Sequence, residues 1–486
     1  MTTTTMESTA QGPATQTSPP IAVPTAVGRR SAGVRAVRAC VRRRSLAALA
    51  TAAIALTPAL GAAAGGAGAA TPPAAPATSA AIAPPNTLTP AERAAGWRLL
   101  FDGRSGEGWR GFRRDGFPAQ GWSVEEGVLK VRSGGGDLIT TEQFGDFELA
   151  LEFLTTPKAN SGIMYRVIEE HGAPWQTGPE FQILDDHGHG LAPSHPHSAG
   201  ALYDLAAPPP TKVLRPAGEW NSARILLRDG RLRHWLNDVK VVDLRVDGDD
   251  WAQLIKASKF KDYAGFGVRP RGHIALQDHG DEVWFRTIKL RDTGAAMPGE
   301  RALFNGRDLD GLIGFLPDGT DPAQVWSVRD GVLICAGKPA GYIRTTEPFE
   351  SYVLKLEWRW PEGKEPGNSG VLLRLVGEDK VWPKSVEAQL HSGSAGDFWN
   401  IDEVRMSTDP ERTRGRNTRK THGNENPVGA WNEYEIVVDG SDIALRVNGE
   451  ELNRAWDVEV VPGTIALQSE GAEIHFRAVR LAPILR

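Results

Sequence analysis

The feature that most constrains this chain is an internal duplication that extends from about residue 96 to the end. Short motifs recur in the same order in two halves: Leu100–Arg104 with Leu303–Arg307, Trp122–Leu129 with Trp326–Leu333, Asn160–Gly162 with Asn368–Gly370, Trp220–Asn221 with Trp431–Asn432, and Ala275–Gln277 with Ala466–Gln468. The offsets are 203, 204, 208, 211 and 191 residues. A constant order with a drifting offset indicates duplication followed by loop insertion and deletion. Because two copies are too few for a solenoid, each copy must bury its own core.

Both copies show the pattern of antiparallel β-structure. Short runs of alternating polar and apolar residues are separated by turn pairs such as Glu126-Gly127, Asn237-Asp238 and Asn448-Gly449. Helical periodicity over a dozen residues is not found in either copy. The sequence therefore predicts an all-β fold of two tandem antiparallel sandwiches, a first domain over 95–292 and a second domain over 300–486.

The first ninety residues have the composition of an export signal and a tether. Seven arginines precede an apolar run of fifteen residues, Leu46–Leu60, which is shorter than the roughly 20 residues of a spanning helix. Arg42-Arg43-Arg44 before this run is similar to a twin-arginine signal. We expect a signal region over 1–69, an Ala/Pro-rich linker over 70–94, and a mature chain without a transmembrane domain, exported to the periplasm or beyond. Sec export and an uncleaved anchor are alternatives.

The charge of the chain argues against a nucleic-acid partner. The formal net charge is -5, with 55 basic and 60 acidic residues. Binding to nucleic acid needs a basic face that neutralises phosphates, and this mild net acidity gives no electrostatic case for one. The sequence therefore predicts no nucleic-acid partner.

Three predicted strands in each copy carry a polar face opposite an apolar one. Alternation pairs Arg166 with Met164, Glu180 with Gln182, and Gln277 with His279 in the first copy. The second copy repeats the set with Arg374, Glu387, Gln389 and Gln468. A solvated outer sheet face would explain the pattern as well. The recurrence of the same residue types in two otherwise different copies favours a binding surface.

Loops rich in histidine and aspartate follow these strands in the first copy. They contain Asp185–Gly190, His195, His197 and Tyr203. A His/Asp cluster can ligate a divalent metal, although the spacing matches no strict ligand motif. In the second copy Asp278-His279 is replaced by Ser469-Glu470, so the two polar surfaces are chemically unequal.

These motifs resemble the 3-keto-disaccharide hydrolase domain family, over 95–292 and 300–484. The resemblance rests on Asn-Ser-Gly, Glu-x-Gln, Trp-Asn and the closing motifs Leu276–Arg286 and Leu467–Arg477. It implies a concanavalin A-like or LamG-like jelly roll with a sugar-binding sheet. It also implies an enzyme that splits sugars oxidised at C3, after an exported sugar 3-oxidoreductase has made the ketone.

Such a reaction needs a base at C2, a stabiliser of the enolate at C3 and a proton donor at C1. From side-chain chemistry we expect His279 or Glu180 as base or acid, Arg166 or a divalent metal as stabiliser, and Tyr203 as proton donor. The predicted substrate-binding residues are Asn160, Gln182, Asp185, Gln277, Arg374, Glu387, Gln389 and Gln468. The alternatives are a non-catalytic carbohydrate-binding pair, and a second copy that serves only folding or capture.

Overall fold

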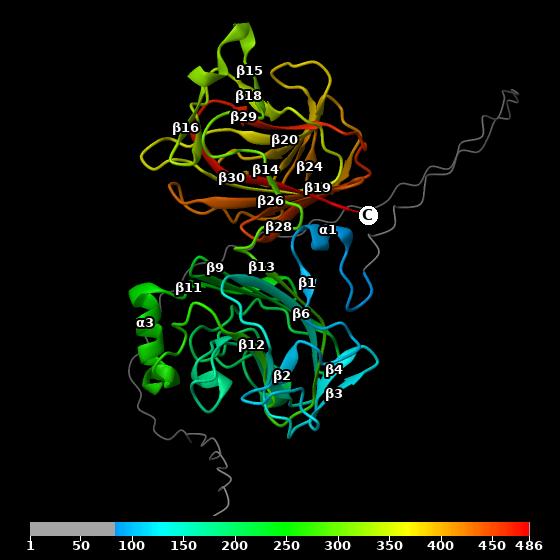
Figure 1. Cartoon of the computed structure of the whole chain (residues 1–486), viewed down its shortest axis with the longest axis vertical. Coiled ribbons are helices and arrows are strands. Elements are labelled where there is room, and N and C mark those ends of the chain that lie inside the picture. Colours follow the sequence, from blue (N-terminus) through cyan, green and yellow to red (C-terminus); the bar gives the residue numbers. More distant parts are fainter. Residues whose placement is uncertain (1–82, 486) are drawn as a thin grey trace, which may run out of the picture. The chain divides into compact units, whose positions relative to one another are not determined.

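A computed structural model describes residues 83–485 (Figure 1). The expected signal region and the linker up to residue 82 lie outside this part of the chain. Within residues 83–485 no helix has both the length and the apolar character needed to span a membrane.

The first domain contains two sheets. The larger has the order β11 (Val239–Arg245), β10 (Arg231–Leu236), β9 (Asn221–Arg228), β6 (Phe147–Thr155), β13 (Val283–Asp292), β4 (Val128–Val131), β3 (Trp122–Glu125), with β1 (Arg98–Leu99) also on β13. The smaller has the order β2 (Trp109–Gly111), β5 (Leu138–Thr140), β12 (His273–Leu276), β7 (Asn160–Val167), β8 (Glu180–Leu184). The helical elements are α1 (Pro90–Ala94), η1 (Pro174–Gln176), α2 (Asp186–His189), α3 (Gly248–Ala257) and η2 (Lys259–Asp262).

The second domain repeats this plan. Its larger sheet has the order β16 (Trp326–Arg329), β17 (Val332–Cys335), β30 (Ile474–Pro483), β19 (Tyr352–Arg359), β26 (Asn432–Asp439), β27 (Asp442–Val447), β28 (Glu450–Trp456), β23 (Ser407–Thr408), with β14 (Arg301–Ala302) on β30. Its smaller sheet has the order β15 (Leu312–Phe315), β18 (Gly341–Thr345), β29 (Thr464–Ser469), β20 (Gly370–Val376), β21 (Lys384–Gln389), β22 (Phe398–Ile401), β25 (Asn417–Thr418), β24 (Thr413–Arg414). The short helical turns are η3 (Pro317–Gly319) and η4 (Pro322–Gln324).

All pairings between these named strands are antiparallel, and seven strands of the larger sheet and five of the smaller one follow the same order in both domains. The expectation of two tandem all-β sandwiches is confirmed.

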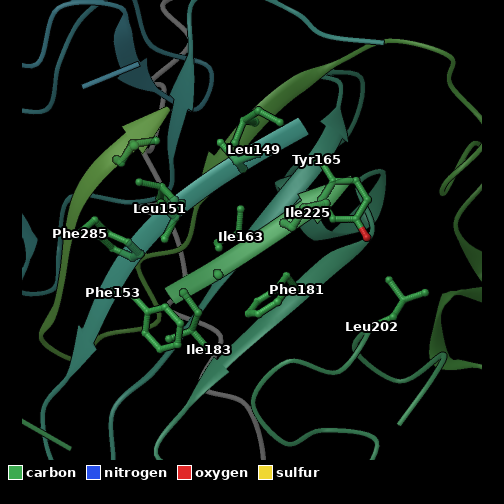
Figure 2. Packing of buried hydrophobic residues seen from close by; sticks show 14 of the residues in the cluster. Leu149, Leu151, Phe153, Ile163, Tyr165, Phe181, Ile183, Leu202, Ile225 and Phe285 are labelled. Carbon is green, nitrogen blue, oxygen red and sulfur yellow. The ribbon is translucent and has the colours of Figure 1, made fainter. Parts of the chain in front are cut away.

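Each sandwich is held together by the side chains that its two sheets direct at each other. Figure 2 shows Leu149 and Phe153 of the larger sheet packing with Phe181 and Ile183 of the smaller one, all at most 1% exposed. Because successive side chains on a strand point to opposite faces, the burial of Phe181 and Ile183 places Glu180 and Gln182 on the other face of β8. The core therefore determines where the polar residues lie.

A β-bulge breaks this alternation in β7. The register of β7 against β12 shifts between His273 and Ala275, and Arg166 has a φ of +54°. Met164 and Val167 consequently lie in one apolar cluster although they are three residues apart. The Arg166 guanidinium is directed at Asp146 instead, with 3.5 Å between Nη2 and Oδ1. The prediction that Arg166 shares a face with Met164 is therefore wrong, because the bulge turns it away.

The same bulge is present in the second domain. Arg374 has a φ of +53° and is 2% exposed. Its guanidinium donates hydrogen bonds to the backbone carbonyls of Glu459, at 2.8 Å, of Glu350, at 3.3 Å, and of Gly440. Arg374 thus holds loops together, and its predicted role in substrate binding is not supported by these contacts.

The described end of the expected linker packs on the first domain. The Asn86 side chain donates to the Gly127 carbonyl at 2.8 Å and accepts the Thr287 N–H at 2.7 Å. Thr89 caps the short helix α1, whose Ala94 is buried. Residues 83–94 are therefore a structured edge of the domain rather than part of a free tether.

We expect Phe153→Ala to lower the free energy of unfolding of the first domain by about 3–5 kcal/mol, because it removes a fully buried ring and leaves a cavity. Urea denaturation checks this value. Val268→Ala, at a side chain that is 61% exposed, is the matched control and should change stability by less than about 0.5 kcal/mol. Equal effects of the two substitutions would contradict the packing described above.

Candidate functional site

Glu180 lies at the centre of the polar residues on the smaller sheet of the first domain. Its side chain packs over Gly162 of β7, so closely that a methyl group built there would lie 2.1 Å from Oε1. Its carboxyl makes no hydrogen bond to any residue from 83 to 485. Burial raises the pKa of Glu180 to about 8; Lys259 lowers it and Asp137 raises it further. A buried carboxyl with little compensation is typical of a catalytic group.

Asp137, directly before β5, is the second carboxyl of the site. Its Oδ1 accepts the N–H of Asp278 at 3.0 Å. Burial raises the pKa of Asp137 to about 6, the hydrogen bond opposes this change, and the charge of Asp278 adds to it. Near neutral pH the site therefore holds one protonated and one ionised carboxyl, the arrangement needed for acid–base chemistry.

Lys259 and Tyr203 add an ammonium and a phenol to the surroundings of Glu180. Lys259 Nζ lies 4.1 Å from the centre of the Tyr203 ring. Desolvation lowers the pKa of Lys259, while Glu180 and Asp204 oppose this effect. Burial, together with the charges of Glu180 and Asp204, raises the pKa of Tyr203 to about 12. The phenol is thus neutral, and among residues 83–485 the Lys259 ammonium is the cation that lowers the pKa of Glu180.

The histidine-rich loop positions these two residues. The His197 ring stacks on the Tyr203 ring at 4.5 Å between centres, and His197 Nε2 lies 2.9 Å from Asp204 Oδ1. The other oxygen of Asp204 accepts the backbone N–H of Lys259 at 2.8 Å. Tyr203 itself donates its N–H to the Glu180 carbonyl at 3.0 Å. The loop is therefore a support for the site.

Amide side chains supply hydroxyl-binding groups next to Glu180. Gln182 Nε2 donates to Asn160 Oδ1 at 3.1 Å. Gln277 follows β12, and its backbone N–H binds the Gly162 carbonyl at 3.0 Å. The structure thus gathers four predicted residues around Gly162, namely Asn160, Glu180, Gln182 and Gln277, and places Tyr203 beside Glu180.

Two further residues predicted to belong to the site, Asp185 and His279, have different surroundings. Both oxygens of Asp185 accept backbone N–H groups, from Lys158 at 2.8 Å and from Gly188 at 3.1 Å, so Asp185 caps α2. His279 is exposed in the turn after β12 and makes no hydrogen bond, ion pair or ring contact with the described residues.

The histidines of the loop are engaged in local contacts. His189 Nε2 lies 2.8 Å from the Lys158 carbonyl oxygen, and His195 Nδ1 accepts the N–H of His197 at 3.1 Å. Among residues 83–485 no group of three or more His, Cys, Asp or Glu side chains is arranged to hold a metal ion.

The second domain has a related but different set of residues. Glu387 packs over Gly370 as Glu180 does over Gly162, and burial, reinforced by Glu470, raises its pKa to about 8. The strand pairings place Tyr342 where the first domain has Asp137. Trp399 occupies the position of Tyr203. Gln389, predicted to bind substrate, instead accepts the backbone N–H groups of Leu390 and His391, each at 2.8 Å.

Sequence reasoning missed Asp137 and Lys259. Lys259 lies in a segment that the second copy lacks, because the offset between the copies falls from 211 to 191 residues between Trp220 and Ala275. This insertion, which also contains α3, was the available signal. Asp137 gave no such signal in the sequence, because Glu180, the residue whose pKa it affects, is 43 positions away in the chain.

Both copies match the same family of known proteins. Residues 96–291 and 299–482, more than half of the chain, match the family model described as a 3-keto-alpha-glucoside-1,2-lyase-like domain. The 3-keto-disaccharide hydrolase of Bacteroides thetaiotaomicron is 32% identical over 231 residues, which cover 41% of this chain and 79% of the relative.

Solved structures are similar to single copies of the domain. A candidate glycosyl hydrolase from Parabacteroides distasonis is 32% identical with a TM-score of 0.40, covering 43% of this chain and 99% of that chain. A second structure from the same organism is 28% identical with a TM-score of 0.34, covering 40% and 98%. The sequence matches carry the assignment: the chain belongs to the 3-keto-alpha-glucoside-1,2-lyase-like domain family and is a glycoside hydrolase-like enzyme.

Proposed function

We propose that the first domain cleaves 3-keto-glycosides by elimination at C1–C2 followed by addition of water. The observation that carries this proposal is the pair of carboxyls with separated pKa values, Glu180 at about 8 and Asp137 at about 6, beside the ammonium of Lys259. Near neutral pH this set contains a proton donor, a base and a cation. These are the three groups that the elimination requires.

In this proposal Asp137 removes the C2 proton, which the C3 ketone acidifies. Lys259 stabilises the enolate oxygen that develops at C3. The electron pair then forms the C1–C2 double bond while the C1–O1 bond breaks, and Glu180 gives its proton to the departing oxygen. Water adds its hydroxyl to C1 and a proton to C2, which yields 3-keto-glucose and an alcohol. Gln182, Asn160 and Gln277 hold sugar hydroxyls, and no redox cofactor is consumed.

The proposed reaction needs a preceding step. A glycoside must be oxidised at C3 before it becomes a substrate, so a sugar 3-oxidoreductase has to act first. The arginine-rich and apolar N-terminal sequence supports the further proposal that both reactions take place outside the cytoplasm.

The direct test is incubation of the full chain with 3-keto-trehalose and with p-nitrophenyl 3-keto-glucoside, followed by detection of 3-keto-glucose. We expect Glu180→Gln to slow cleavage of 3-keto-trehalose by about 10²–10⁴-fold, because its leaving group needs a proton. The nitrophenolate leaves without one, so this substrate should be far less affected. Asp137→Asn should slow the cleavage of both substrates. It should also slow the exchange of the C2 proton for deuterium in D2O. Equal losses on both substrates for Glu180→Gln would refute the acid role.

The pH dependence follows from the two carboxyls. Glu180 is a donor only below its raised pKa of about 8, and Asp137 is a base only above its pKa of about 6. We expect kcat/KM to be highest between these values and to fall tenfold per pH unit outside them. Lys259→Met removes the cation that lowers the pKa of Glu180, so the alkaline limb should move upward. A downward shift of that limb would contradict the assignment.

A matched pair of glycine substitutions tests which domain carries the activity. A methyl group at residue 162 would lie 2.1 Å from Glu180 Oε1, and one at residue 370 would lie 2.3 Å from Glu387 Oε1. Each substitution must displace the carboxyl above it. We expect Gly162→Ala to reduce kcat/KM at least a hundredfold, whereas the effect of Gly370→Ala on the cleavage rate should be several-fold at most. The reverse ranking would assign catalysis to the second domain.

A further inference from the structure

The smaller sheet of the second domain contains buried oxygen atoms that lack hydrogen-bond partners. Glu387 Oε1, Gln468 Oε1 and Asn368 Oδ1 are buried and have no partner within residues 83–485. Glu387 and Gln468 are only 5% and 2% exposed. Each buried polar atom without a partner is costly, so these three oxygens call for an explanation.

These oxygens lie close together. A methyl group built at Gly370 would lie 2.3 Å from Glu387 Oε1 and 2.5 Å from Gln468 Oε1, so both oxygens face the same point. Asn368 lies two residues before this glycine, and its backbone forms an isolated antiparallel β-bridge with Glu470. A ligand that satisfies them must bring several hydroxyl or amide donors within a few ångströms of one another.

Two exposed tryptophans flank this acceptor group. Trp399 pairs with Glu387 across β22 and β21, so both side chains lie on the same face of the sheet. Trp399 is 39% exposed. Trp382, 56% exposed, and Asn368 both lie beside Glu470, and they oppose the rise that burial causes in its pKa. Exposed aromatic rings beside polar acceptors provide an apolar surface and a hydrogen-bonding edge at once.

The same surface lacks the groups that the first domain would use for chemistry. Tyr342 replaces Asp137, Trp399 replaces Tyr203, and the segment that carries Lys259 is absent from the second copy. Among the described residues, the charged group that shifts the pKa of Glu387 is another carboxylate, Glu470. An anionic ligand would therefore be repelled, and an enolate would have no stabiliser.

We propose that the second domain is a non-catalytic binding site for a neutral, unoxidised hexopyranose unit, which stacks on Trp399 and donates its hydroxyls to Glu387, Gln468 and Asn368. This inference is independent of the reaction proposed for the first domain, because the ligand carries no ketone and is not cleaved.

The test is isothermal titration of the full chain with trehalose and with methyl α-glucoside at millimolar concentrations. We expect Trp399→Ala to weaken binding about tenfold, since it removes an aromatic contact, and Trp399→Phe to restore most of the affinity. Glu387→Ala should abolish detectable binding. Val428→Ala, at a 46% exposed side chain on the loop before β26, is the control and should bind as the parent does.

Two outcomes would overturn the proposal. One is the absence of binding in the parent chain, which would mean that a protonated Glu387 donates to Gln468 and that the pair is only structural. The other is binding that Trp399→Ala and Glu387→Ala both leave unchanged. Because Trp399 is exposed, its substitution does not threaten folding, and circular dichroism of each variant checks this. Neither outcome depends on whether the first domain cleaves 3-keto-glycosides.

Discussion

Desolvation of one glutamate on the smaller sheet of each domain keeps that carboxyl largely protonated near neutral pH. In water a glutamate is ionised at neutral pH, but Glu180 and Glu387 are pressed over glycines of the neighbouring strand and held largely away from solvent. The free energy for this burial comes from the sandwich core, where Phe181 and Val386 anchor the same strands on the opposite face. A glycine is required at Gly162 and Gly370 because a larger side chain would occupy the space of the carboxylate.

The two domains have diverged by changing the surroundings of this glutamate. The first domain adds Lys259 through an inserted segment and Asp137 directly before β5, and its histidine-rich loop fixes Tyr203 by ring stacking and by the His197–Asp204 pair. The second domain has tyrosine and tryptophan at two of these positions and a second carboxylate, Glu470, nearby. One scaffold thus presents a charged, reactive set of groups in one copy and an aromatic, acceptor-rich set in the other.

Bulges explain why the two recurring arginines do not belong to either site. In a regular strand Arg166 would lie on the same face as Met164, and Arg374 on the same face as Leu372. An extra residue in β7 and in β20 reverses the alternation, and each guanidinium serves loops at the end of the sandwich instead. A residue type that recurs between copies therefore marks shared architecture as well as shared chemistry.

The sequence by itself determined the duplication, the all-β class and the strand faces that carry Glu180, Gln182, Glu387 and Gln468, because these follow from local alternation and from the order of motifs. It did not determine the bulges, the capping roles of Asp185 and Gln389, or the approach of Asp137 and Lys259 to Glu180. Those features arise from register and from contacts between residues far apart in the chain, such as Glu180 and Lys259, 79 positions apart. Only the tertiary structure brings such groups together and removes water from them, and that removal shifts their pKa values.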